Sequence, residues 1–136
     1  MKEQHRQLMT WACDCSVHVL PLFGETIDER LLHALQVANA WKEGAASVGD
    51  ARKASVNAHA VARDASNPVS KAVARSVGQA VATAHMADHS PGAAWYALKA
   101  VIGAGKSIDA ERKWQDEQLP ADVKDLILSA REMKNI

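Results

Sequence analysis

The sequence contains few of the residues that staple or stiffen a small protein. Among 136 residues there are two cysteines, four prolines, one phenylalanine and one tyrosine. The two cysteines, Cys13 and Cys15, would point roughly 200° apart on a helix, so we expect two free thiols rather than a disulfide. A chain of this length can bury a core without disulfides or metals. The scarcity of cysteine therefore favours a reduced, cytoplasmic protein that is held together by packing.

An excess of charge of one sign is also missing. The chain has 16 Lys and Arg against 16 Asp and Glu, so its formal net charge is zero. Domains that bind nucleic acid usually carry a basic excess, and we therefore expect no nucleic-acid partner. No apolar run approaches the roughly 20 residues of a membrane span. The polar stretch MKEQHRQLMTWACDC has no apolar core of the kind found in a signal peptide. We expect no membrane association and a cytoplasmic location.

Alternation of β-branched and polar residues, the pattern of half-buried strands, is nearly absent, whereas helix formers dominate. The sequence therefore predicts an all-α single domain over residues 1–136, an antiparallel bundle of about six to seven helices joined by short loops. The predicted helices cover residues 3–20, 26 or 28 to 42, 47–65, 67–89, 91–104 and 109–118, followed by a last helix that begins at 120 or 122.

Several of these helices have recognisable start and end signals. Four starts share a short polar side chain at the cap position: Thr26 with Glu29, Ser47 with Asp50, Asn67 with Pro68, and Ser90 with Pro91. Glycines at 44, 103 and 105 predict helix ends. The segment IGAGKS at 102–107 lacks the spacing of a phosphate loop and is interpreted as a helix C-cap. Gly78 lies inside a predicted helix and costs about 1 kcal/mol relative to alanine, so it predicts close packing against a neighbour.

Histidines give the clearest candidates for chemistry. His85 and His89 are four residues apart, so on one helix they would share a face and could chelate a metal. A metal needs at least a third ligand; the adjacent Asp88 points elsewhere, and only His5 could arrive, from the first helix. We therefore expect no metal, no cofactor and no catalysis. The alternative hypothesis is a small metal-binding or ligand-binding enzyme that uses His85 and His89, with Asp14 and His18 as further members.

The tryptophans divide into two pairs. Trp11 and Trp41 lie in apolar stripes and are predicted to fill the core, whereas Trp95 and Trp114 have polar neighbours and are predicted to be partly exposed. On the first helix, Asp14 and His18 are spaced to form an i, i+4 pair.

The segment 78–100 is the most chemically varied part of the chain, and we expect it to form the end of one helix, a tight corner and the start of the next. Alternating helix directions predict two groups at opposite ends of the bundle. The first group is His5, Trp11, Trp41, His85, His89 and Trp95. The second group is Phe23, Arg75 and the half of the third helix that contains His59.

Three segments resemble a known bacterial family: WACDCSVHVLPLF at 11–23, AHAVARDAS at 58–66 and ATAHMADHSPGAAWYALKA at 82–100. The family is described as putative immunity proteins, alanine-rich and all-helical. The resemblance covers about residues 8–104, with the C-terminal helices at 109–135 expected to pack on that part. It implies an all-α fold and binding that neutralises a toxin. The positions that match the family's motifs are Trp11, Asp14, Cys15, Leu20, Arg30, His59, His85, Asp88, His89 and Tyr96.

We therefore expect a non-catalytic protein that binds a cognate toxin through the corner. The candidate partner-binding residues are Trp11, Asp14, His85, Asp88, His89, Trp95 and Tyr96. Besides the enzyme hypothesis, a structural module that dimerises through an alanine-rich helix face is a further alternative. The oligomeric state stays open between monomer and homodimer.

Overall fold

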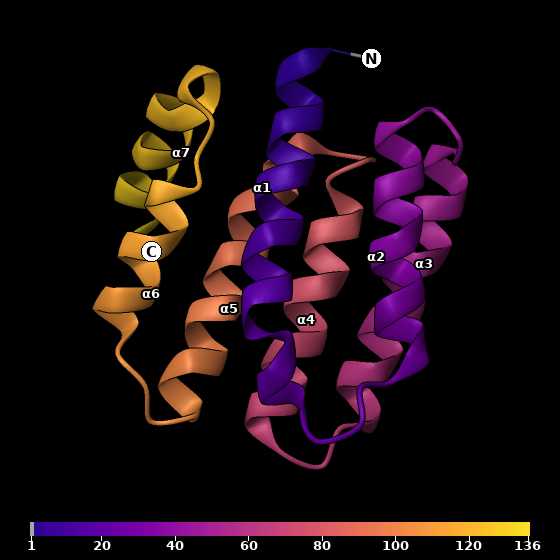
Figure 1. Ribbon diagram of the computed structural model, residues 1–136, viewed down its shortest axis with the longest axis vertical. Coiled ribbons are helices and arrows are strands. Elements are labelled where there is room, and N and C mark those ends of the chain that lie inside the picture. Colours follow the sequence, from indigo (N-terminus) through magenta and orange to yellow (C-terminus); the bar gives the residue numbers. More distant parts are fainter. Residues whose placement is uncertain (1) are drawn as a thin grey trace.

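The computed structural model describes residues 2–136, so Met1, the first residue of the predicted domain, lies outside the described residues. Seven α-helices, two short 3-10 helices and no strand occur over the described range, which confirms the all-α prediction. The α-helices are α1 (Glu3–Val19), α2 (Glu29–Lys42), α3 (Val48–Asp64), α4 (Pro68–Ala82), α5 (Ser90–Gly103), α6 (Ile108–Glu117) and α7 (Ala121–Lys134). The 3-10 helices are η1 (Leu20–Phe23) and η2 (Ala87–His89). Successive α-helices run in alternating directions (Figure 1).

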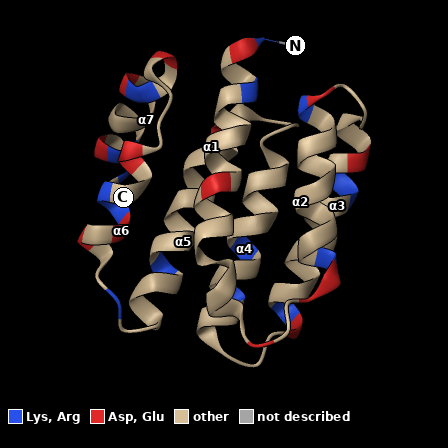
Figure 2. Cartoon of the chain, viewed as in Figure 1, with Lys and Arg blue, Asp and Glu red and all other residues tan. Residues whose placement is uncertain are grey.

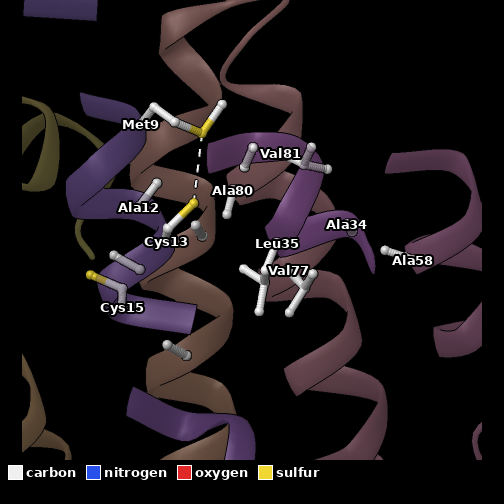
Figure 3. Packing of buried hydrophobic residues seen from close by; sticks show 14 of the residues in the cluster. Met9, Ala12, Cys13, Cys15, Ala34, Leu35, Ala58, Val77, Ala80 and Val81 are labelled. Carbon is white, nitrogen blue, oxygen red and sulfur yellow. Dashed lines mark hydrogen bonds between the residues drawn. The ribbon is translucent and has the colours of Figure 1, made fainter. Parts of the chain in front are cut away.

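Helix α4 lies at the centre of the bundle. It packs most extensively against its neighbours α3 and α5, and α1 and α2 cover it from one side (Figure 1). The contacts are close because small residues fill the buried rows, among them Ala58, Ala80 and Ala34 (Figure 3). Small residues let helix axes approach toward the lower end of the usual range of about 8–10 Å.

Two of the four predicted helix starts are confirmed. Ser47 and Asp50 form a capping box, in which the Ser47 hydroxyl accepts from the Asp50 backbone N–H and the Asp50 carboxylate accepts from the Ser47 N–H, both at 3.0 Å. The Asn67 side chain accepts from the Ser70 N–H at 2.8 Å, with proline at the next position. In both cases a side-chain oxygen satisfies one of the first helical N–H groups, which have no partner inside the helix.

Of the two starts predicted for the second helix, the one at Asp28 is confirmed, and its carboxylate accepts from the Arg30 N–H at 2.9 Å, whereas the capping box of Thr26 with Glu29 is wrong. The cap predicted at Ser90 is also wrong. Ser90 has helical dihedrals and is the first residue of α5 rather than its cap. Its hydroxyl donates to the Ala87 carbonyl at 2.8 Å, because η2 leads directly into α5 and brings that carbonyl within reach.

The predicted end of α4 at 89 is also wrong, since the helix ends at Ala82. The three residues that follow form i→i−3 backbone hydrogen bonds, which tighten the turn, and Met86 is then extended, with φ −154° and ψ 115°. The Thr83 carbonyl accepts from His5 Nε2 of α1, a partner 78 residues away. That distant donor holds the chain in the turn.

Glycine ends two helices as predicted. Gly44 and Gly105 have φ of +78° and +75°. After α5, the N–H of Lys106 reaches the Val101 carbonyl and the N–H of Gly105 reaches the Ile102 carbonyl, each at 3.0 Å. This double closure is a Schellman motif, so the segment at 102–107 is a helix C-cap, as predicted.

The C-terminal helices α6 and α7 are tied to the bundle through buried polar groups. Trp11 Nε1–H donates to the Gln115 carbonyl at 2.8 Å, and the Gln115 amide donates to the Ala94 carbonyl at 3.1 Å. Arg131 of α7 donates to the Gln115 side chain at 2.6 Å and to Asp116 at 3.0 Å. One buried glutamine therefore links α1, α5, α6 and α7.

Candidate functional site

The corner between α4 and α5 brings together five residues, which we call the corner site: His85, Asp88, His89, Trp95 and Tyr96. His85 lies in the turn after α4, Asp88 and His89 lie in η2, and the aromatic residues lie on the first turns of α5. His85 and Asp88 are exposed, whereas His89, Trp95 and Tyr96 are half-buried. The sequence predicted these residues at one corner, and the structure places them there.

His89 is fixed by a neighbour that the sequence did not single out. Its Nδ1–H donates to Gln79 Oε1 of α4 at 2.8 Å. Gln79 in turn lies against Gly92 of α5, where an added Cβ would come within 2.9 Å of Gln79 Oε1. The glycine therefore makes room for Gln79, and Gln79 orients the imidazole of His89.

His85 and His89 do not share a helix face, contrary to the prediction, because α4 has ended before His85. Their rings are nevertheless neighbours, with centroids 5.8 Å apart and planes inclined by 29°. Across residues 2–136, no group of three or more His, Cys, Asp or Glu side chains is arranged to hold a metal ion. Asp14 and His18, the further members of the enzyme hypothesis, do not join this pair, since His18 binds Glu111 of α6 at 2.6 Å.

The pKa of His89 is lowered, first because burial disfavours the imidazolium and second because His85 lies nearby. The adjacent Asp88 carboxylate acts in the opposite direction. A neutral His89 that donates from Nδ1 leaves Nε2 as an acceptor. The corner thus presents two hydrogen-bond acceptors to a partner: Nε2 of His89, whose ring is oriented by Gln79, and the exposed carboxylate of Asp88.

His59 of α3 lies against α4 at the one place where α4 has no side chain. An added Cβ at Gly78 would come within 2.6 Å of His59 Nε2, which confirms the close packing predicted for this glycine. Arg75 donates to His59 Nδ1 at 2.7 Å, so Nε2 carries the proton of a neutral ring. Burial and the guanidinium of Arg75 both lower the pKa of His59.

His59 lies close to the corner site, not at the opposite end of the bundle. It lines the same surface depression as His85 and His89, because it is near the middle of α3 and the contact with Gly78 brings it across α4. The sequence assigned it to the far end by helix direction alone. Arg75 donates to His59 but lines the depression between α4 and α5 together with Pro68 and Gly103, so it does not join the corner site.

Trp95 and Tyr96 form an aromatic pair at the edge of the corner. Their ring centroids are 4.9 Å apart in an edge-to-face arrangement. The ammonium of Lys99 lies 4.1 Å from the Trp95 centroid and 5.6 Å from that of Tyr96, both within the range of cation–π attraction. Half-buried aromatic rings held in this way are rigid, which lowers the entropy lost when a partner covers them.

Two open depressions of about 470 Å³ each flank His89. One extends over α5 toward Trp95 and Tyr96, and the other lies between α3 and α4 toward His59 and Arg52. Gln79 and His89 border both. The corner site is therefore a broad, shallow surface rather than an enclosed cavity, a shape suited to contact with a macromolecule.

The two remaining candidate residues lie outside this surface. Trp11 is completely buried and is hydrogen-bonded to α6, so it fills the core, as predicted for its stripe, and it reaches no partner. Asp14 is exposed on α1 beside Lys42 and lines neither depression. The predicted pair of Asp14 with His18 is wrong, because His18 binds Glu111 and stacks on Trp114 at 3.5 Å.

The cysteines are buried, free thiols. Burial raises the pKa of Cys13 to about 12 and that of Cys15 well above its usual value. Cys13 Sγ lies 3.7 Å from Met9 Sδ (Figure 3). Both side chains thus behave as small apolar residues, since a thiol without access to solvent or a nearby base is a poor nucleophile.

Sequence reasoning missed Gln79, and it assigned His59 to the wrong end. Gly78 was the only local sign of a close approach, and it did not say which side chain approaches. Nothing in the sequence near Gln79 distinguishes it from any other polar residue on a helix surface.

The fold and site together describe an all-helical protein whose broad, shallow surface presents histidines and a rigid aromatic pair. The sequence profile of the Imm-5 like putative immunity protein family matches residues 1–122, and the chain belongs to this family. The same comparisons find no match among curated proteins or among solved structures. In the described part of the chain, no helix has both the length and the apolar character needed to cross a bilayer.

Proposed function

We propose that this chain is an immunity protein that binds a cognate bacterial toxin through the corner site and neutralises it without catalysis. Family membership supports a protein partner. The observation that carries the proposal is the rigid, half-exposed pair of Trp95 and Tyr96 beside His89. Tryptophan and tyrosine are enriched among the residues that dominate binding energy at protein interfaces.

The area that a protein partner would need to cover is a modest share of the molecular surface. A stable complex buries roughly 800 Å² on each partner, which is about a ninth of the 7084 Å² surface of this molecule. The two depressions meet at Gln79 and His89, so the corner site continues from α5 across α4 to α3. A partner covering both depressions would contact α3, α4, α5 and the end of α7 at Lys134, and this surface would occlude the partner's active site.

Co-expression with a toxin tests the proposal directly. The probes are toxin domains cloned from the source organism, each produced in a sensitive bacterial host with and without the chain. We expect the chain to restore growth against one of them, and that toxin and the purified chain to elute as one complex. The proposed function would be contradicted if the chain failed to protect the host from every such toxin and formed a complex with none of them.

A pair of tryptophan variants tests the location. Trp95→Ala should weaken toxin binding on the order of 30-fold, because truncation of a central aromatic residue costs about 2 kcal/mol. Trp114→Ala is the matched control, since Trp114 is also half-buried but lies on α6 against His18. Thermal melting establishes that both variants are folded. Equal affinity of the two variants would place the interface elsewhere.

A further inference from the structure

A third depression, beside the two at the corner site, has a different chemical character. It follows the seam between α4 and α5 away from the corner and has a volume of about 510 Å³. We call it the α4–α5 groove and define it by Lys71, Ala72, Arg75, Tyr96, Lys99 and Ile102. Tyr96 also lines the depression beside His89, so the groove continues from the corner site.

The groove has an apolar floor and basic walls. Ala72 contributes little side-chain volume, and Ile102 is 54% exposed, so its aliphatic surface is open to a partner. Lys71 and Lys99 are exposed on opposite walls, one on α4 and one on α5. The combination offers apolar contact and positive charge within one cleft.

No acid offsets this charge. Helices α4 and α5 carry Lys71, Arg75 and Lys99 but no Asp or Glu, as Figure 2 shows. Over residues 2–136, the ion pairs of arginine and histidine with Asp or Glu lie on other elements, and none involves these three side chains. The chain as a whole has equal numbers of acidic and basic residues, so the acids that balance these three positive charges lie on other helices and loops.

Neutral partners hold two of the three cations in place. Arg75 donates to the neutral ring of His59, which orients the guanidinium without cancelling its charge. Lys99 is held over Trp95 and Tyr96 by cation–π attraction. An orienting contact of this kind reduces the side-chain entropy that is lost when an anion binds. The groove is therefore organised for an anionic group before any partner arrives.

We propose that the α4–α5 groove receives an acidic segment of the toxin, with carboxylates against Lys71, Arg75 and Lys99 and an apolar side chain on Ile102. This inference rests on the proposed function, because it takes the partner to be the toxin. Continuity with the corner site through Tyr96 lets one protein cover both surfaces. A nucleic acid is less suited, since phosphate binding needs a longer basic stripe and the apolar floor would be left unused.

Charge reversal tests the groove with the same toxin. The double variant Lys71→Glu, Lys99→Glu should weaken binding about tenfold or more at low salt, since it places two acids against the acidic segment. The matched control is Lys113→Glu, Lys124→Glu, which changes the net charge equally at exposed positions on α6 and α7. The control should alter affinity by no more than about twofold, because screening weakens charges beyond about 10 Å.

Salt dependence separates the groove from the rest of the interface. Raising the salt from about 50 to 500 mM should weaken the wild-type complex, and the double variant should have lost most of that dependence. Wild-type affinity in the double variant would overturn the inference and leave the proposed function standing. Absence of any wild-type complex would overturn both. Binding of a single-stranded DNA of about 20 nucleotides, lost in the double variant, would assign the groove to a polyanion instead.

Discussion

Substitution of Gly78 by alanine gives a quantitative test of how α3 lies on α4. Alanine is favoured over glycine inside a helix by about 1 kcal/mol. The added methyl group, however, would lie 2.6 to 2.9 Å from three ring atoms of His59. Overpacking of this kind costs about 1–3 kcal/mol, and displacement of the ring also breaks its hydrogen bond with Arg75. We expect Gly78→Ala to lower the free energy of unfolding by up to about 2 kcal/mol.

The same substitution should have the opposite sign once the ring is removed. In a His59→Ala background the helix-propensity gain is no longer opposed, so Gly78→Ala should stabilise by about 1 kcal/mol. For a chain of this length, 1 kcal/mol corresponds to about 3–4 °C in Tm. The assay is urea unfolding of the wild type, both single variants and the double variant, which together form a double-mutant cycle.

Gly49→Ala serves as the control, because its nearest neighbour is at an ordinary contact distance of 3.5 Å from the added Cβ. It should have the same effect with and without His59. The structural reasoning is refuted if Gly78→Ala changes stability by the same amount in both backgrounds, since the two residues would then not be in contact.

Three further predictions concern pH, thiol reactivity and a helix cap. The pKa of His59 in the folded protein is held below its usual value of about 6.5. Between about pH 7 and 5 the unfolded chain therefore binds a proton at His59 more readily than the folded chain does, and the free energy of unfolding falls as the pH decreases. His59→Gln should reduce this fall in urea unfolding at each pH, and an unchanged slope would contradict it. Cys13 and Cys15 should resist a thiol reagent at about pH 8 in the folded protein and react when the protein is unfolded in guanidinium. Rapid labelling of the native protein would contradict the burial of the two thiols. Ser47→Ala should lower the free energy of unfolding by about 1 kcal/mol, because the capping oxygen is lost. Ser47→Gly should lower it by only a few tenths, because glycine has no side chain to shield the free helical N–H groups from water.

The sequence predicted those parts of the fold that depend on neighbours along the chain. The helix positions followed from the spacing of apolar residues and from short polar caps such as Ser47 and Asn67. Gly78 predicted a close approach because a helix interior otherwise disfavours glycine. These signals act within one or two turns, so one sequence is sufficient to find them.

The errors occurred where a distant residue decides the local structure. The segment that contains His85 and His89 has no glycine or proline between 79 and 90, so its pattern gave no reason to end the helix at Ala82. The end is held by His5 of α1, which binds the Thr83 carbonyl from 78 residues away. In the same way, Glu111 displaced Asp14 as the partner of His18. Such pairs depend on the packing of the completed bundle, which no local pattern contains.

The candidate site was predictable in its centre and not in its extent. The mixture of histidine and aromatic residues drew attention to the corner, and the structure gathers five of the seven candidates there. The groove beside it was not visible, because Lys71, Arg75 and Lys99 are separated by up to 28 positions and become neighbours only when α4 and α5 pair.

The hydrogen bond between Trp11 and Gln115 has a consequence for how the molecule folds. It closes a loop of 104 residues, so the first helix cannot complete its burial until nearly the whole chain has been synthesised. Until then the largest side chain of the core has no cover on one side, and the nascent bundle exposes an apolar surface to other chains. Folding should therefore finish with the docking of the last two helices, and a nonsense mutation that removes them should give an aggregating product rather than a shorter working one.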